Sequence, residues 1–214
     1  MITSIRYLFS HYLLSIIFFS NVYSQNFNVK PYLQNVTPSS IHIMWETTSN
    51  DESIVHWGET TELGYTATGD AENSINSYYI HDVHLTDLNQ NTRYYYKVVT
   101  GDLESEIFDF VTPIGSEFES SLRVIAMSDM LKDYSNFNKF QEIINQGIFS
   151  YLDISDTLLL TDVLDLVLIP GDLVDNGINH TEWGNHFFGP SEPLFSHVPL
   201  YPVLGNHENN SSYY

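Results

Sequence analysis

The chain has 214 residues, 43% of them hydrophobic, which is enough to bury the cores of one or two globular domains. With 27 acidic residues against 7 Lys and Arg residues, its formal net charge is −20, which argues against nucleic acid or anionic membrane surfaces as partners. The chain has no cysteine, which excludes a disulfide framework, a thiolate metal site and a cysteine nucleophile.

The N-terminus has the pattern of a secretory signal. Arg6 precedes a largely apolar stretch, residues 7–20, and small or compact residues stand before Gln25, where a signal peptidase would cleave. Polar interruptions leave this stretch short of the roughly 20 apolar residues of a membrane-spanning helix, so a retained anchor is the weaker alternative. We therefore predict that residues 1–24 are a signal peptide, that the mature protein is secreted or periplasmic, and that it makes no stable membrane insertion.

Residues 25–113 predict an all-β sandwich. Short runs in which apolar and polar residues alternate are separated by turns, and Trp45 is the expected anchor of the core. Leu88 and the residues around Tyr94 resemble the tyrosine corner of fibronectin type III domains, in which the phenol bonds to upstream backbone. We interpret the other aromatic side chains as core or ordinary sheet surface, with a carbohydrate-binding face as a minority alternative. The clearest alternating runs are Ile41 to Trp45, Tyr94 to Val98 and Ile107 to Val111.

The segment 114–121 lacks apolar periodicity and indicates a linker, after which the pattern changes to that of an α/β domain. Apolar residues at helical spacing between 137 and 148, and aromatic residues between 181 and 199, predict crossover segments that cover a sheet. Trp183, in the second crossover, is expected in the core. Three apolar runs predict parallel strands, namely Leu122–Met127, Leu164–Ile169 and Pro199–Leu204.

Each of these predicted strands ends in residues that can bind a cation. Asp129 follows the first strand, Asp172 the second, and Asn206 and His207 the third. Because the carboxyl ends of parallel strands meet at one edge of a sheet, we expect these side chains to converge there. They suit hard divalent or trivalent metal ions. The alternative, in which each aspartate is only a turn or helix-capping residue, explains one such motif better than three in order.

The same strand ends carry the motifs of a known family. S-D-M at residues 128–130, G-D-L-V-D-N-G at residues 171–177 and G-N-H-E at residues 205–208 resemble the first three motifs of the calcineurin-like metallophosphoesterases. In the preceding domain, P-Y-L-Q, M-W-E-T and L-N-Q-N-T-R-Y-Y-Y-K-V are similar to the N-terminal domain of purple acid phosphatases. The resemblance implies two domains, a fibronectin type III-like sandwich and then an α/β metallophosphoesterase domain over residues 122–214.

The resemblance also implies roles for the site residues. Asp172 would bridge two metal ions, Asp129 would complete the ligand shell of one, and Asn206 would offer an amide oxygen to the other. The metals would be iron, zinc or manganese, and a metal-bound hydroxide would attack the phosphorus of a small phosphate ester. His207 would contact the phosphate or help the leaving oxygen depart, rather than hold a metal.

The chain departs from the family's pattern at two positions. The family's histidine two residues after the first aspartate, and the purple acid phosphatase tyrosine three residues after the bridging aspartate, are replaced by Leu131 and Asp175. Either Asp175 or Tyr134 takes the vacant place, or the first metal has fewer protein ligands. A tyrosinate suits ferric iron, so its loss argues for divalent or redox-inert metals.

The family's later histidine motifs do not occur before the chain ends at Tyr214. The resemblance therefore implies a truncated domain with uncovered crossover segments, weak metal binding and negligible hydrolysis by the chain as given. His180, His186 and His197 precede the G-N-H-E strand, and we interpret them as surface or packing residues rather than replacement ligands.

The predicted function is metal-dependent hydrolysis of phosphate monoesters, as in an acid phosphatase. A phosphodiesterase or nucleotidase of the same superfamily is an alternative, because residues outside these motifs shape the substrate pocket. A second alternative is a non-catalytic secreted surface or sugar-binding protein with a decayed enzyme domain. The sequence sets neither the substrate nor the metal identity nor the oligomeric state.

Overall fold

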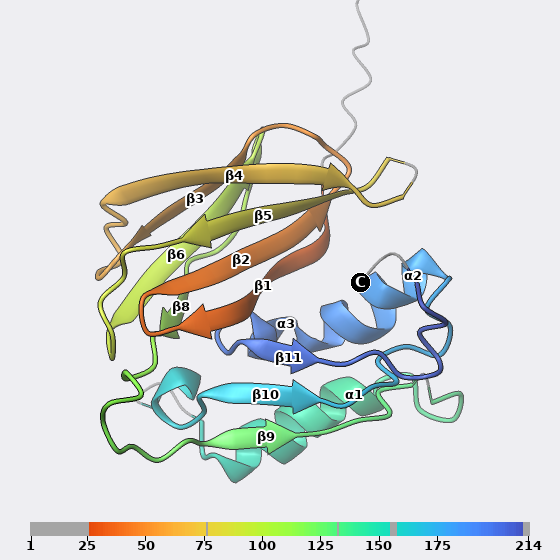
Figure 1. The fold of residues 1–214 in the computed structure, drawn as a ribbon. Helices are drawn as coiled ribbons and strands as arrows, with labels where there is room; N and C mark the ends of the chain where they lie inside the picture. The colour runs from red at the N-terminus through yellow and green to blue at the C-terminus, as the bar shows by residue number, and fades with distance from the viewer. Residues whose placement is uncertain (1–25, 76, 132, 155–157, 212–214) are drawn as a thin grey trace, which may run out of the picture.

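The computed structural model describes residues 26–75, 77–131, 133–154 and 158–211. The predicted signal peptide, residues 1–24, lies outside these ranges. Within them, every helix is too short or too polar to cross a membrane. The described chain forms a β domain followed by a smaller α/β domain, and the two pack against each other (Figure 1).

The first domain is an antiparallel sheet that curls around its own core (Figure 1). Its strands pair in the order β1-β2-β5-β4-β3-β6-β7, and β8 also pairs with β6. β4 belongs to both layers, because it pairs with β3 along its first part and with β5 along its last part. The predicted sandwich is therefore confirmed, with its layers joined through one strand. The strands are β1 (Phe27–Thr37), β2 (Ser40–Thr47), β3 (Ser53–Gly58), β4 (Tyr65–Asn73), β5 (Tyr79–Leu85), β6 (Arg93–Thr100), β7 (Leu103–Glu104) and β8 (Phe108–Val111).

Gly69 lies where β4 passes from one layer to the other. It pairs with Ser53 of β3, whereas the next residue, Asp70, pairs with Asp82 of β5. A Cβ atom at Gly69 would lie 2.0 Å from the carbonyl oxygen of Asp82. Because only glycine permits this approach, Gly69 fixes the point at which the sheet folds over.

The core of the first domain follows the alternating pattern. Ile41, Ile43 and Trp45 of β2 are fully buried. The indole Nε1 of Trp45 donates to Oγ1 of Thr100 at 2.9 Å, so its one polar atom is satisfied inside the core. The predicted tyrosine corner is present, because the Asn89 backbone N–H donates to the Tyr94 hydroxyl oxygen at 2.9 Å.

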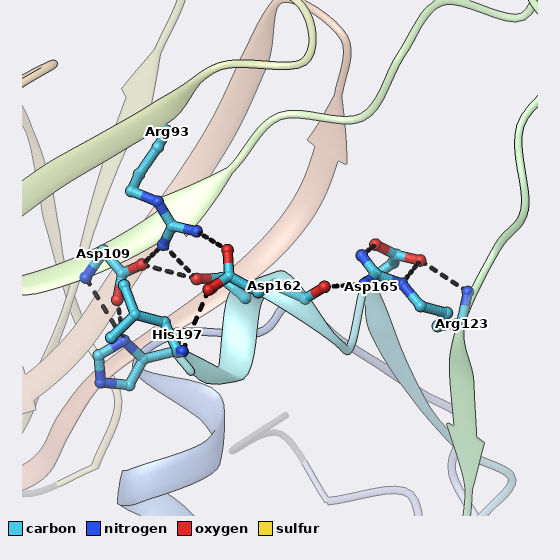
Figure 2. A network of polar contacts seen from close by, with 8 residues as sticks. Arg93, Asp109, Arg123, Asp162, Asp165 and His197 are labelled. Carbon is cyan, nitrogen blue, oxygen red and sulfur yellow. Dashed lines mark hydrogen bonds and ion pairs between the residues drawn. The ribbon is translucent and has the colours of Figure 1, made fainter. Parts of the chain in front are cut away.

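The second domain contains the three predicted parallel strands, in the order β11-β10-β9. They are β9 (Val124–Ala126), β10 (Leu166–Ile169) and β11 (Leu200–Pro202), each shorter than the apolar run that predicted it. Just before β9 and β10, Arg123 and Asp165 form an ion pair with Nη2 and Oδ1 2.6 Å apart (Figure 2). This pair joins the two strand beginnings at the edge opposite the predicted site.

Both predicted crossovers are helical. They comprise α1 (Lys139–Glu142) continuing into the π-helix η1 (Ile143–Phe149), and α2 (His180–Glu182) continuing through the π-helix η3 (Trp183–Phe188) into α3 (Gly189–Phe195). A 3-10 turn, η2 (Leu160–Asp162), precedes β10. In the first crossover Phe140, Ile144 and Ile148 are buried, one in every four residues. Phe137 and Ile143, predicted on the same face, are 67% and 40% exposed. That part of the prediction is wrong, because Phe137 precedes the helix and Ile143 lies off the buried stripe.

The two domains share a hydrophobic core. Val29 and Tyr32 of β1 belong to the same buried cluster as Trp183 and Leu194 of the second crossover. The ring centroids of Tyr32 and Phe188 are 4.6 Å apart. Trp183 is therefore a core residue, as predicted. The expectation that the crossover segments would be left uncovered is wrong for this one, because β1 of the first domain packs on it.

A polar network also joins the domains (Figure 2). Asp109 on β8 is only 6% exposed, and its carboxylate accepts hydrogen bonds from Arg93 on β6 and from Oγ1 of Thr161 at 2.7 Å. Nη2 of Arg93 reaches across to Oδ1 of Asp162 at 2.6 Å. Nδ1 of His197, which follows α3, lies 2.6 Å from Oδ1 of Asp109. The buried acid is thus held from both domains.

Candidate active site

The three strand ends meet at one edge of the small sheet, as predicted. Their loops are bonded directly to one another. The Met130 N–H donates to the carbonyl oxygen of Asp172 at 2.9 Å, and the His207 N–H donates to Oδ1 of Asp172 at 3.1 Å. Asp172 therefore lies between the Asp129 loop on one side and the Asn206 loop on the other. Asp129 and Asn206 are exposed, and Asp172 is partly buried.

The backbone turns sharply at both aspartates. Asp129 and Asp172 have φ angles of 58° and 54°, in the left-handed region that aspartate tolerates better than most residues. Gly171, with φ 105°, lies against the backbone of Gly205. A Cβ atom at Gly205 would lie 2.2 Å from Oδ1 of Asp172. The G-D and G-N-H-E motifs thus need their glycines so that the two loops can touch.

His207 is oriented by its own loop contacts. Its Nδ1 donates to the carbonyl oxygen of Asp175 at 2.8 Å, which leaves Nε2 as the ring nitrogen available to a substrate. The hydrogen bond to the Asp175 carbonyl raises the pKa of His207; burial opposes this rise, and the charges of Asp172, Asp175 and Glu208 add to it. An imidazole so placed is a hydrogen-bond donor in mild acid.

Glu208 is the residue that the sequence reasoning missed. Its side chain is fully buried, and its carboxylate accepts four backbone hydrogen bonds. Oε2 accepts from Asp172 at 3.0 Å and from Gly205 at 2.5 Å, while Oε1 accepts from Leu173 at 2.7 Å and from Val174 at 3.2 Å. A buried acid with these donors holds the two motif loops together. Its position at the end of G-N-H-E was the only signal in the sequence.

The two candidates for the vacant ligand position bind each other. The hydroxyl group of Tyr134 donates to Oδ2 of Asp175 at 3.1 Å. This hydrogen bond, followed by the charge of Asp175, raises the pKa of Tyr134. Tyr134 is therefore a neutral phenol here, not the phenolate that ferric iron prefers.

The three histidines of the second crossover do not join this site. Nε2 of His180 lies 2.9 Å from Oε1 of Glu46, and His197 binds Asp109, so both contact buried acids of the first domain. Nδ1 of His186 is buried without a hydrogen-bond partner among the described residues. His180 and His197 therefore lie at the interface between the two domains.

The side chains at the strand ends offer ligand atoms of the right kind for a metal ion, but there are few of them. Asp129, Asp172 and Asn206 offer carboxylate and amide oxygens, the ligands that hard cations prefer. Within the described ranges, however, no group of three or more His, Asp or Glu side chains could hold a metal ion. A tightly held metal ion would therefore need ligands in addition to these three residues.

Comparison with known proteins finds a matching family model for each of the two domains. Residues 27–112 match the family model of the purple acid phosphatase N-terminal domain, and residues 122–214 match that of the calcineurin-like phosphoesterases. No curated protein matches the chain.

Two solved structures are similar to parts of this chain. The structure of PhoD aligns with a TM-score of 0.59 and 13% identity over 85% of this chain, which spans 39% of the PhoD chain. The sensor domain of the anti-sigma factor RsgI4 of Pseudobacteroides cellulosolvens aligns with 45% of this chain and 99% of its own, at 15% identity. Its TM-score of 0.35 is too low to support an argument. Residues 27–112 thus belong to the family of purple acid phosphatase N-terminal domains, and residues 122–214 belong to the calcineurin-like phosphoesterases.

Proposed function

We propose that the protein hydrolyses phosphate monoesters of small molecules with the help of bound metal ions, as an acid phosphatase does. Calcineurin-like phosphoesterases generally use two metal ions and act on phosphate esters. The observation that best supports the proposal is the meeting of three strand ends, where the loops of Asp129, Asp172 and Asn206 bond to one another. Iron, zinc or manganese bound there would polarise the phosphoryl group as a Lewis acid.

Asp172 has the central part in this proposal. It follows β10, the middle strand, so it lies between the residues that would hold one ion each, Asp129 after β9 and Asn206 after β11. One lone pair of Oδ1 is used by the His207 N–H, which leaves Oδ2 and the second lone pair of Oδ1 for cations. A carboxylate in this position can be shared between two ions, whereas an amide cannot.

His207 is assigned to the substrate. Because Nδ1 is held by the Asp175 carbonyl, the ring has a fixed orientation with Nε2 as its free atom. We assign to Nε2 a hydrogen bond to a phosphate oxygen and the transfer of a proton to the leaving oxygen. Both tasks need a proton on Nε2, and mild acid favours that protonated form of the imidazole.

Export completes the proposal. The pattern of residues 1–24 supports a signal peptide, and a secreted or periplasmic phosphatase would act on phosphate esters outside the cytoplasm. The high negative charge of the chain supports small substrates over nucleic acid.

The test is an assay of the natural protein. Loaded in turn with iron, zinc and manganese, it is given p-nitrophenyl phosphate and, in parallel, bis-p-nitrophenyl phosphate. We expect turnover of the monoester that a chelator abolishes. A preference for the diester would favour the phosphodiesterase alternative, and no metal-dependent turnover of either compound would contradict the proposed function.

A further inference from the structure

We propose that Glu208 is a positioning residue for the metal site: its buried carboxylate fixes the Asp172 loop to the Asn206 loop before any cation arrives. This inference rests on the proposed function. Glu208 does not touch the substrate in this scheme, so it acts only through the residues that it holds.

The first argument is the distribution of its hydrogen bonds. The four N–H donors come from two different strand ends, three from residues 172–174 after β10 and one from Gly205 after β11. Oε2 alone bridges the two ends, because it accepts from both Asp172 and Gly205. One oxygen atom therefore sets the distance between the backbone of the bridging candidate, Asp172, and the backbone just before Asn206.

The second argument is that, in the part of the chain that the structure describes, Glu208 is the acceptor for each of these four N–H groups. Strand ends leave backbone N–H groups without ladder partners, and a buried N–H that lacks an acceptor destabilises the fold. A carboxylate has about four acceptor positions, so one side chain can satisfy all four groups. Glu208 is 0% exposed, which keeps water from replacing it.

The third argument is the glycine contact on the same side. Gly171 and Gly205 bring the two backbones together, and Oδ1 of Asp172 is held by the His207 N–H. Glu208 thus closes a ring of contacts around Asp172. A preorganised ligand loses less freedom when a cation binds, which strengthens binding without adding a ligand.

The test compares two acid-to-amide variants of the chain, Glu208→Gln and Glu182→Gln. Each carboxylate oxygen of Glu208 accepts two backbone N–H bonds. In Glu208→Gln an NH2 group, which cannot accept, replaces one of these oxygens in either orientation of the amide, so two of the four bonds are lost. Glu182 is the matched control, because its Oε2 accepts the Asn176 N–H at 2.8 Å in the same loop but touches none of the four donors. Two readouts are used without substrate, namely hydrogen exchange of the amides at 172–174 and 205, and Mn²⁺ affinity by electron paramagnetic resonance.

We expect Glu208→Gln to speed exchange of these amides and to weaken Mn²⁺ binding about tenfold or more, the usual effect of removing a residue that orients metal ligands. Glu182→Gln should leave both unchanged. Unaltered exchange in Glu208→Gln would overturn the inference, as would an equal loss of affinity in Glu182→Gln, because charge rather than position would then be the cause.

A second variant covers the case in which Glu208→Gln does not fold. Gly205→Ala places a methyl group against Asp172 and separates the same loops while Glu208 stays intact, so Mn²⁺ affinity should fall similarly. Unchanged affinity in Gly205→Ala would overturn the inference. If the unaltered chain binds no Mn²⁺, the proposed function loses its support, whereas amide exchange still decides whether Glu208 holds the loops.

Discussion

His197 and Asp109 lie on different domains, yet Nδ1 of the imidazole and Oδ1 of the carboxylate are only 2.6 Å apart. Asp109 is 6% exposed and also binds Arg93 and Thr161. Burial on its own would raise the pKa of Asp109, but hydrogen bonds from His197 and Thr161 and the charges of His197 and Arg93 outweigh it and hold the pKa below its usual value. The interface thus depends on this acid being ionised.

Asp109→Asn should therefore destabilise the chain by about 3–5 kcal/mol, the usual cost of removing one partner from a buried ion pair. The measurement is unfolding in urea at pH 7. Glu104→Gln is the control, because Glu104 pairs with Lys97 at the surface of the same domain and should cost less than about 1 kcal/mol. Because the folded pKa is depressed, the difference between wild type and Asp109→Asn should persist above the unfolded pKa near 3.9 and vanish as the pH falls through the folded value. Equal effects of the two variants would contradict this account.

His81 should make the first domain sensitive to acid. It is fully buried between the hydroxyl groups of Thr47 and Ser53, and burial lowers its pKa to about 4. Between pH 6.5 and pH 4 the unfolded chain takes up a proton that the folded chain refuses, so stability falls as the pH falls. We expect His81 to account for a loss of about 2 kcal/mol between pH 7 and pH 5. Urea unfolding at both pH values measures this loss, and His81→Gln should lack that part of the pH dependence. If the stability of His81→Gln falls as much between pH 7 and pH 5 as that of the wild type, His81 is not the cause of the acid sensitivity.

The tyrosine corner offers a test of one hydrogen bond. Tyr94→Phe leaves the Asn89 N–H without its acceptor and should cost about 1–3 kcal/mol of the free energy of unfolding. Tyr95→Phe is the matched control, because the neighbouring side chain points to the other face of β6 and is partly exposed. If both variants unfold at the same urea concentration, the corner does not stabilise the domain.

Two variants of the natural protein distinguish the proposed role of Asp172 from that of His207. Asp172→Asn should remove nearly all turnover together with much of the bound metal, because an amide cannot bridge two cations. His207→Ala should lower turnover while metal is retained. Metal content after dialysis and kcat with p-nitrophenyl phosphate measure both effects. Loss of metal from His207→Ala would show that His207 is a ligand and that its assigned role is wrong.

Export predicts a processed N-terminus. Protein recovered from the medium or periplasm of a secreting host should start near Gln25, because small residues precede it. N-terminal sequencing checks this, and an intact Met1 in exported protein would contradict it.

The sequence was sufficient for features that depend on local patterns. Apolar runs that end at Gly171-Asp172 and Gly205-Asn206 predicted both the strands and their shared edge, and alternation predicted the burial of Trp45. These predictions succeeded because strand formation and burial follow from the pattern of neighbouring residues.

Contacts between distant residues could not be predicted in the same way. The donors to Glu208 are 34 to 36 residues away at β10, and only the folded chain shows that they converge on one carboxylate. The acids that bind His180 and His197, Glu46 and Asp109, lie 134 and 88 residues away in the other domain. No local pattern pairs such residues.

The position of Glu208 in the chain also determines when its hydrogen bonds can form during synthesis. The amides of Leu173 and Val174 are made 35 and 34 residues before the side chain that they bind. At about 5–20 residues per second, the ribosome needs roughly 2–7 seconds to cover that interval. Until Glu208 is made, the N–H groups of Leu173 and Val174 lack this acceptor, so a nascent chain that has completed β10 cannot yet hold its Asp172 loop in the arrangement of the site. The loop would reach its final arrangement only after Glu208 has been made and β11 has paired with β10, which makes the site one of the last parts of this chain to form.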